Sequence, residues 1–599
     1  MNRTAQVPIE PARGLILDKN NFVLARDNPG FALEIIPNEQ ENLDATIEKI
    51  KQIIPVSEAD IKRFNKMRLE GDKFDSFPIR SKLTEEEVAK FSVQQFNFKG
   101  VSVAKRSFRE YPEGDLGVHV VGYVGRVNQR DKERIKKNGQ EDIYQGTTHI
   151  GKLGIEQSYE SLLHGTNGYE NLEVMASGRQ LGVLDEKPAI PGFNLQLTID
   201  AYIQSQVEKA LNGRRGALVA IEPSTGQVLA FVSAPTYDAN QFVDGISETA
   251  WKELNESKNR PLFNRALQGA YPPGSTYKPF MGLAALETGK RTPGAITNDP
   301  GYWMFGNHRF RSHGNGGLGA VNMHRSIVKS SNVYYYQLAN DMGVNAIHDF
   351  MKPLGFGQIT GIDIPGEARG VLPSTDWKRR TYRRPEQQKW YAGETISLGI
   401  GQGYNNFTML QLASATATLA ADGVRHTPHL VKAEQDPQTL EFKNIPQPAP
   451  VNLGYQPAHV ALVKRGMVGV TQEGTSTRVF AGAAYLSGGK TGTAQAVTIG
   501  QKSRYDARRL AEHQRDHSLY IAFAPADNPR IAVAAIVENA GFGAAHAAPL
   551  VRRVMDYWLA GQYPSEADLR AVQQGQAGAP IGTPRRVADM VFETAPALP

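Results

Sequence analysis

Three short motifs in the C-terminal two thirds of the chain carry the residue types needed for serine acyl transfer without histidine. In chain order they are Ser275-Thr276-Tyr277-Lys278, Ser330-Ser331-Asn332 and Lys490-Thr491-Gly492-Thr493. A serine hydroxyl is a weak nucleophile until a base removes its proton, and a lysine three residues later on a helix lies on the same face. Together, in this order, the motifs are typical of a serine acyltransferase.

The surroundings of the first motif separate it from chance matches to the same pattern. The spacing S-x-x-K also occurs at Ser102–Lys105, Ser326–Lys329 and Ser487–Lys490. Only Ser275 follows a breaker cluster, Tyr271-Pro272-Pro273-Gly274, and precedes an apolar run that favours a helix. We therefore predict that Ser275 starts a helix and is the nucleophile, with Lys278 as its base.

A lysine base needs a lowered pKa, because the ordinary value of about 10.4 leaves the amine protonated at pH 7. Burial and nearby cations lower a lysine pKa, and here Lys490 is expected to supply the second positive charge. We expect Lys278 to be neutral, or to share a proton with Ser275 or Ser330. Ser330 is predicted to relay a proton to the leaving amine, and the Asn332 amide to bind the substrate peptide bond.

The third motif is predicted to form the opposite wall of the cleft as a strand. Lys490 with the hydroxyls of Thr491 and Thr493 would bind a substrate carboxylate, and Gly492 would leave room for substrate to lie against the backbone. The N–H groups of Ser275 and Thr493 are expected to face the developing oxyanion. Losing one such donor typically costs ~2.7–4 kcal/mol of barrier.

Length and composition narrow the class of protein. The chain has 599 residues, of which 40% are hydrophobic and 21% charged, as in a globular protein of two or more domains. The net charge is +6, and no nucleic-acid motif accompanies the densest basic stretch, 378–384. We interpret that stretch as a solvated loop, with binding of an anionic polymer as the alternative. The chain has no cysteine, which excludes disulfides and a thiol nucleophile, and we predict neither cofactor nor metal.

Periodicity predicts a multi-domain α+β protein. Residues 1–190 are predicted to be a mixed α/β region with little capacity for chemistry, and 118–124 is β-rich within it. A turn near 188–193 marks a boundary, and 191–560 holds two strand pairs, 217–232 and 519–537, with helices between them. That order predicts an antiparallel sheet covered by helices. Residues 561–599, rich in Ala, Pro, Gly and Gln, are predicted to be a disordered tail.

Beyond its chemistry, the chain resembles penicillin-binding protein 2, the class B transpeptidases of bacterial side-wall elongation. The resemblance covers 8–560 and rests on the three motifs together with Arg13-Gly14-Leu15-Ile16-Leu17-Asp18, Gly151-Lys152-Leu153-Gly154-Ile155-Glu156, Tyr271-Pro272-Pro273-Gly274 and Gly401-Gln402-Gly403. It implies a dimerisation-type pedestal and a transpeptidase domain. Ser275 would attack the D-alanyl-D-alanine bond of a peptidoglycan stem peptide, pass the acyl group to a second stem, and be acylated by β-lactams.

The same resemblance implies partners and a location. The substrates would be stem peptides of the lipid-linked precursor or nascent glycan, and the partners the SEDS glycosyltransferase RodA and rod-shape scaffold proteins. The family carries one N-terminal helix in the inner membrane and a periplasmic catalytic domain; this chain starts with polar residues, so the anchor is expected in the full-length protein but is missing here. Some relatives hold a metal before the second motif. This stretch has Leu318 and no cysteine, so no bound zinc is predicted.

Two alternatives use the same acylation site. A D,D-carboxypeptidase or β-lactamase would use water as acceptor, although a pedestal of about 190 residues argues against a simple hydrolase. A non-catalytic β-lactam sensor or wall-assembly scaffold would keep the serine but not turn over. Many relatives have aspartate at the position of Asn332 and serine at the position of Thr491. Both exchanges preserve the polar character of the site.

Overall fold

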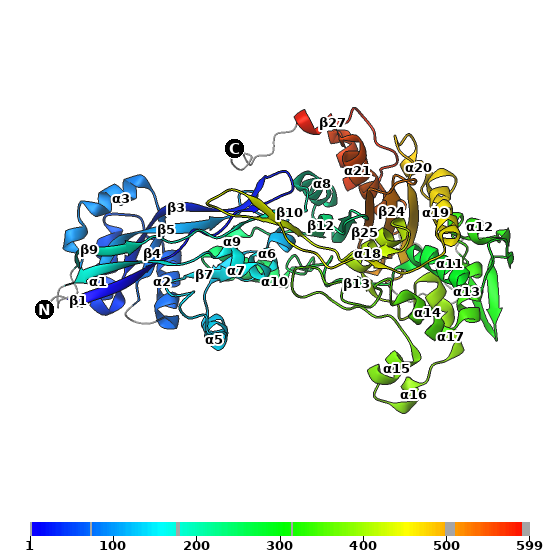
Figure 1. The fold of residues 1–599 in the computed structure, drawn as a ribbon, viewed down its shortest axis with the longest axis horizontal. Coiled ribbons are helices and arrows are strands. Elements are labelled where there is room, and N and C mark those ends of the chain that lie inside the picture. Colours follow the sequence, from blue (N-terminus) through cyan, green and yellow to red (C-terminus); the bar gives the residue numbers. More distant parts are fainter. Residues whose placement is uncertain (1–2, 72–74, 175–179, 313–315, 497–509, 590–599) are drawn as a thin grey trace.

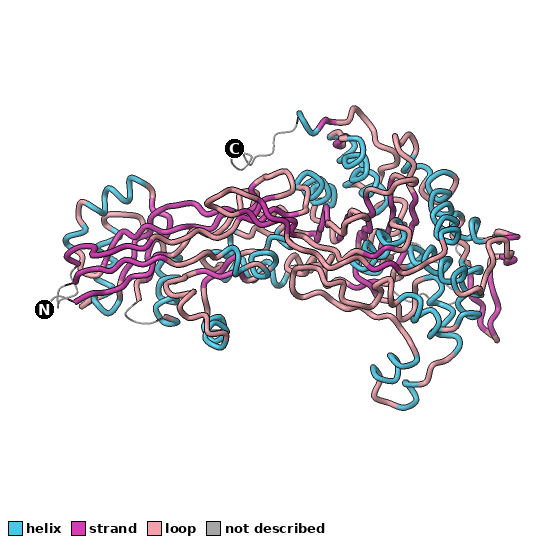
Figure 2. The backbone as a smooth tube through the Cα atoms, viewed as in Figure 1, coloured by secondary structure: helices cyan, strands magenta, loops and turns pink. Residues whose placement is uncertain are grey.

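The computed structural model describes residues 3–71, 75–174, 180–312, 316–496 and 510–589. The molecule is elongated, with the N-terminal pedestal at one end and the helix-rich C-terminal part at the other (Figure 1). Strands run lengthwise through the pedestal, whereas helices gather around the sheet of the C-terminal part (Figure 2). Within the described ranges, no helix has the length and apolar character that a bilayer crossing requires.

A five-stranded antiparallel sheet forms the centre of the C-terminal part, in the order β12-β11-β25-β24-β23. Its strands are β11 (Gly216–Ile221), β12 (Val228–Ala234), β23 (Gly488–Ala494), β24 (His517–Ala524) and β25 (Ile531–Val537). The two predicted strand pairs are both present as antiparallel neighbours. Strands from the two ends of this half therefore meet in the middle of one sheet, as predicted.

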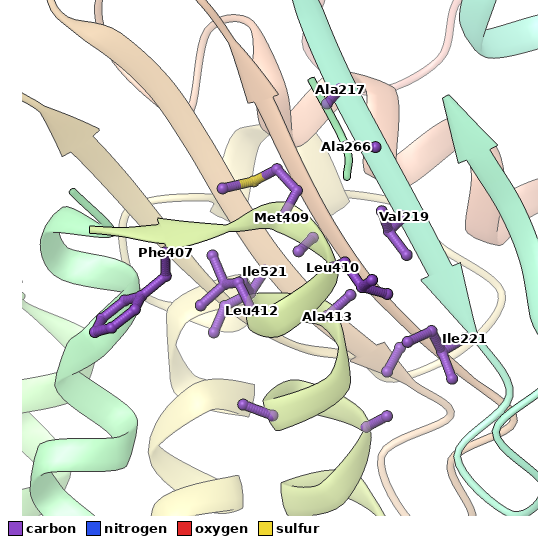
Figure 3. Close-up of a cluster of buried hydrophobic side chains, with 14 of the residues drawn as sticks. Ala217, Val219, Ile221, Ala266, Phe407, Met409, Leu410, Leu412, Ala413 and Ile521 are labelled. Atoms are coloured by element: carbon purple, nitrogen blue, oxygen red, sulfur yellow. The ribbon is translucent and has the colours of Figure 1, made fainter. Parts of the chain in front are cut away.

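Helices cover both faces of this sheet because alternate side chains of each strand point to opposite sides. Along β11, Ala217 and Val219 belong to one buried cluster, and Leu218 to the other. Helix α18 (Met409–Ala420) packs on the first face against β11, β24 and β25, and Met409 and Ile521 lie there (Figure 3). Helices α8 (Ala201–Leu211) and α21 (Ala547–Ala560) pack on the second. Helix α11 (Lys278–Glu287) belongs to the same buried cluster as α18 and packs mainly against other helices, among them α14 (Val344–Met351) and α19 (Pro457–Gln472).

The pedestal contains a long antiparallel pair, β3 (Val23–Ile35) with β5 (Val101–Glu110), extended by β4 (Phe77–Leu83). Helices α1 (Leu43–Lys51), α2 (Glu58–Glu70) and α3 (Glu85–Ser92) pack around it. The β-rich prediction for 118–124 is wrong: Val118–Val121 form a helical turn, α4, and only then does β6 (Val124–Arg126) begin. All four residues of α4 are buried. Tertiary burial outweighs the β-propensity of these valines.

The predicted boundary near 188–193 is not a free linker. Strand β10 (Asn194–Leu197), just after it, pairs in parallel with β2 (Ile16–Leu17) of the pedestal and antiparallel with β20 (Val431–Gln435) of the C-terminal part. One sheet therefore draws strands from both sides of the boundary. The two halves are joined by continuous backbone hydrogen bonding as well as by the chain itself.

The prediction of a disordered tail over 561–599 is wrong for 561–589. This segment forms β26 (Gln562–Tyr563), α22 (Glu566–Gln573) and β27 (Arg585–Arg586). Tyr563 and Val572 are buried, and Asp568 makes a two-pronged ion pair with Arg553 of α21, at 2.9 and 2.6 Å. A few anchoring side chains order a stretch whose bulk composition suggests disorder. The remainder of the predicted tail, 590–599, lies outside the described residues.

Candidate active site

The three motifs converge on the amine of Lys278. Its Nζ lies 2.8 Å from the Ser330 carbonyl oxygen, 3.1 Å from Ser330 Oγ and 2.7 Å from Asn332 Oδ1. Lys490 Nζ lies 2.9 Å from the same Ser330 hydroxyl. Residues 212 positions apart in sequence, from Lys278 to Lys490, are therefore linked through one serine side chain.

Ser275 lies on a 3₁₀ turn, η3 (Gly274–Tyr277), that continues directly into α11. Gly274 makes the entry possible: its φ is +56°, and a Cβ there would lie 2.5 Å from the Thr493 carbonyl oxygen. The turn is tied down by a bond from Gly274 N–H to Gly401 O, 3.0 Å. Lys278, one turn later, is fully buried, whereas Ser275 remains partly exposed. The predicted nucleophile, Ser275, is thus nearer the solvent than the amine of Lys278.

Ser330 occupies the turn between α12 (Met323–Val328) and α13 (Asn332–Met342). Its φ is +57°, in the left-handed region that costs a non-glycine residue about 1–2 kcal/mol. This conformation directs both its carbonyl and its hydroxyl oxygen to Lys278. The next residue, Ser331, caps α13 by accepting the Tyr334 N–H at 3.2 Å. Strain at a residue that touches the buried amine is typical of a functional turn.

The third motif lies on β23, the edge strand of the five-stranded sheet. One of its edges pairs with β24, and the other is not paired within that sheet, which leaves backbone groups available for an extended substrate. The interpretation of Gly492 needs correction: a Cβ there would lie 2.7 Å from Thr276 Cγ2 and 3.0 Å from Pro273 O. Gly492 therefore lets the strand approach the nucleophile turn, and the space it leaves is filled by protein.

Burial dominates the electrostatics of the two lysines. Desolvation, reinforced by the positive charge of Lys490, lowers the pKa of Lys278 well below its ordinary value, with Asp299 acting in the opposite direction. Desolvation lowers the pKa of Lys490 to about 7. An amine that is neutral near pH 7 can accept a proton from Ser275 or Ser330. Proton movement along Lys278, Ser330 and Lys490 requires no histidine.

Aromatic and polar residues complete the surroundings of the base. The ring of Tyr335 lies 5.6 Å from Lys278 Nζ, and Tyr335 Oη is within 3.0 Å of Ser326 Oγ. Ser326 belongs to one of the chance S-x-x-K matches; its hydroxyl is buried and donates to Met323 O at 2.6 Å. Ser326, a chance match to the motif, therefore stabilises helix α12.

Sequence reasoning missed three residues near the site. Gln402 Nε2 donates to Thr493 O at 3.1 Å, and Thr475 Oγ1 lies 2.7 Å from Thr491 Oγ1. Asp299, buried behind the second motif, accepts a hydrogen bond from Ser331 at 2.6 Å. The cluster Gly401-Gln402-Gly403 was a sequence signal from which Gln402 could have been predicted. No spacing rule connects Thr475 or Asp299 to the motifs, because only the fold brings these two residues to the site.

The basic stretch 378–384 is partly structural, which corrects its interpretation as a solvated loop. Its first residues lie on α15 (Thr375–Thr381), and Lys378 is buried, with its Nζ 2.5 and 2.7 Å from the two carboxylate oxygens of Glu394. Tyr404 Oη donates to Glu394 at 2.9 Å. One of the five positive charges of the stretch, that of Lys378, is therefore neutralised inside the protein, and the four arginines are exposed.

Comparison with known families divides the chain into two matched regions. Residues 216–556 match the penicillin binding protein transpeptidase domain, and residues 8–197 match the penicillin-binding protein dimerisation domain. The transpeptidase match contains all three motifs, and the dimerisation match covers the pedestal.

Relatives with assigned names align along most of their length. The chain is 40% identical over 570 residues to the peptidoglycan D,D-transpeptidase MrdA of Haemophilus influenzae, covering 93% of this chain and 86% of that protein. It is 39% identical over 585 residues to the protein of the same name from Escherichia coli K12, covering 96% and 91%.

Solved structures agree with this alignment. The PBP2 of Pseudomonas aeruginosa, in complex with WCK 5153, superimposes with a TM-score of 0.69 at 38% identity, covering 93% of this chain and 97% of that one. The PBP2 of Helicobacter pylori, in a complex with MreC, superimposes with a TM-score of 0.79 at 27% identity, covering 94% and 100%. A structure of a peptidoglycan synthase complex that coordinates polymerization and crosslinking gives 0.70 at 28% identity, covering 94% and 93%.

Proposed function

The chain belongs to the penicillin-binding proteins, as a peptidoglycan D,D-transpeptidase of the PBP2 type, and from this premise we propose that Ser275 is its nucleophile. The observation that carries the proposal is the buried amine of Lys278, one helical turn after Ser275 and bonded to Ser330 and Asn332. A buried lysine of lowered pKa beside a partly exposed serine has the arrangement of a base with its nucleophile.

Acylation follows from these positions. Neutral Lys278 takes the Ser275 proton as Oγ attacks the carbonyl between the two terminal D-alanines of a donor stem peptide. The N–H groups of Ser275 and Thr493 hold the oxyanion that forms. The C–N bond then breaks, and Ser330 passes a proton to the departing D-alanine amine and is reprotonated from Lys278 or Lys490. The product is an ester between Ser275 and the shortened stem.

Deacylation reverses the proton path with a second amine. The amine of an acceptor stem loses a proton to the Lys278–Ser330 pair and attacks the ester, and Ser275 Oγ leaves with that proton. The result is a peptide cross-link and a free enzyme. The unpaired edge of β23 supports this order, because an extended stem that binds there as an added strand excludes water from the ester.

Partners and location follow from relatives. The Helicobacter pylori PBP2 forms a complex with MreC, and another relative's structure joins polymerization with crosslinking. We therefore infer that this chain works with a scaffold protein of the MreC kind and with a glycan polymerase, for which RodA is the candidate. We infer that the protein works at the inner membrane, with its transpeptidase domain in the periplasm, where its stem-peptide substrates lie.

The test is product analysis with uncross-linked peptidoglycan bearing pentapeptide stems. After muramidase digestion, mass spectrometry should find cross-linked dimers and released D-alanine with the unaltered protein, and neither with Ser275→Ala. The control is Ser102→Ala, the exposed serine of another S-x-x-K match on β5, which should behave as the unaltered protein. Shortened monomers without dimers would instead indicate a D,D-carboxypeptidase. Rod-shaped cells that carry only Ser275→Ala would indicate a sensor or scaffold.

A further inference from the structure

Asp299 is a buried carboxylate directly behind the second motif. It ends β14 (Thr297–Asp299), which pairs with β17 (Gly319–Val321), and it is 1% exposed. One of its oxygens accepts from Ser331 Oγ at 2.6 Å and the other from the Gly301 N–H at 2.8 Å. A buried charged group requires such partners, and here the side-chain partner belongs to the active-site turn.

The contact with Ser331 places Asp299 one residue from each of two site residues. Ser331 lies between Ser330, which is held in the left-handed region, and Asn332, which contacts Lys278. Its hydroxyl donates to Asp299 and accepts the Tyr334 N–H, so both functions of that hydroxyl are used. The turn therefore cannot rotate without breaking a buried, charge-assisted hydrogen bond.

The charged and titratable groups that face Lys278 come from three elements. Lys490 faces it from β23, the Tyr335 ring from α13, and Asp299 from β14. The positive charge of Lys490 favours loss of the Lys278 proton, and the negative charge of Asp299 favours its retention. Asp299 therefore opposes Lys490 in a site that holds two buried amines.

We propose that Asp299 is a positioning residue for acylation, which through Ser331 holds Ser330 and Asn332 against Lys278. This inference rests on the proposed roles of Ser275 and Lys278. It extends them by assigning a function to a residue that does not touch the substrate.

The first variant is Asp299→Asn, which preserves shape and removes the charge; its one carbonyl oxygen can still accept from Ser331 Oγ, while the Gly301 N–H loses its acceptor. Acylation by a fluorescent penicillin is measured from pH 5 to 9. Because removal of a negative charge eases deprotonation of Lys278, the pH below which acylation fails should fall. The expected shift is about half a pH unit, less than the 1–3 units of a direct ion pair, so at pH values on the acid limb the variant acylates about threefold faster.

The second variant, Ser331→Ala, keeps the charge and removes the hydrogen bond. Acylation should slow about tenfold at every pH, because Ser330 and Asn332 lose their support, while the acid limb stays where it is. The control is Thr416→Val on α18, which also removes a fully buried hydroxyl, one that donates to Leu412 O at 2.7 Å. Thr416→Val should change neither the acylation rate nor the pH of the acid limb.

The possible results distinguish failure of the role proposed for Asp299 from failure of the proposed function. An unmoved acid limb in Asp299→Asn, with an unaltered rate in Ser331→Ala, overturns the role of Asp299 alone. If Asp299→Asn does not fold by circular dichroism, Ser331→Ala decides: a rate equal to that of the unaltered protein overturns the proposal, and a uniform loss supports it. Failure of the unaltered protein to form a penicillin adduct at Ser275 would instead overturn the proposed function.

Discussion

Replacement of Lys490 by methionine should make the protein's stability less dependent on pH. Lys490 is fully buried, and its pKa in the folded protein is about 7, against an ordinary value of 10.5 in the unfolded chain. Between these values the unfolded chain binds one more proton than the folded one at this site. Stability of the unaltered protein therefore rises with pH in this window, and the cost of burying Lys490 is largest below pH 7.

The size of this pH dependence follows from the one extra proton that the unfolded chain binds at Lys490. The free energy of unfolding should rise by about 1.4 kcal/mol per pH unit from this residue, or about 2.7 kcal/mol between pH 7.5 and 9.5. Lys490→Met lacks this contribution. Between pH 7.5 and 9.5, the free energy of unfolding of the unaltered protein should therefore rise by about 2.7 kcal/mol more than that of the variant. Set against this, the variant loses the hydrogen bonds to Ser330 Oγ and Thr491 O, at 2.9 and 3.1 Å, each of which contributes about 1 kcal/mol at any pH.

The assay is urea unfolding, followed by tryptophan fluorescence, at pH 7.5, 8.5 and 9.5 for both proteins. Lys90→Met on α3 is the control: its side chain is 57% exposed, so its stability should follow that of the unaltered protein at each pH. Parallel stability curves for Lys490→Met and the unaltered protein would show that Lys490 holds its proton in the fold. The assignment of a nearly neutral lysine pair would then be wrong.

Three further predictions concern the base, the nucleophile turn and the pedestal. Lys278→Met should reduce penicillin acylation about 10²- to 10⁴-fold in a stopped-flow assay, because general-base catalysis is lost. Gly274→Ala should displace the turn against the Thr493 carbonyl oxygen, which would lie 2.5 Å from the new methyl group, and should lower both the acylation rate and the melting temperature. Glu156→Gln should destabilise the protein by up to about 3 kcal/mol in urea unfolding, because the buried Arg109 and Arg13 lose the carboxylate that they share, at 2.7 and 2.6 Å, and keep only Asp27 and Glu160 as ion-pair partners.

Each of these has a clear opposing result. Undiminished acylation by Lys278→Met would mean that another group removes the proton. A Gly274→Ala protein with unaltered rate and melting temperature would mean that the turn tolerates a side chain. Unchanged stability of Glu156→Gln would mean that the shared carboxylate is not needed to stabilise the buried arginines of the pedestal.

The candidate catalytic residues could be predicted from sequence because their signal is local. A breaker cluster before Ser275, three residues to Lys278 and a glycine-rich strand around Lys490 are each short-range patterns. The apolar runs within 217–232 and 519–537 are local signals too, and both strand pairs that they predict are present. Patterns made by residues close together along the chain can therefore be recognised from the sequence alone.

Features that depend on distant contacts were not legible. The valines of 118–121 favour a strand by propensity, yet form a helical turn because they are buried on all sides. The segment 561–589 is ordered by single contacts such as Arg553 with Asp568. The left-handed conformation of Ser330, and the arrival of Asp299 behind it, follow from packing between elements that no spacing rule relates.

Intact-mass analysis after exposure to a labelled penicillin, with peptide mapping of the adduct, bears most directly on how this enzyme works. The expected result is one equivalent of drug on the peptide that contains Ser275, together with no adduct on Ser275→Ala. A drug-modified peptide from elsewhere in the chain, or an unmodified Ser275 in folded protein, would contradict the mechanism at its first step.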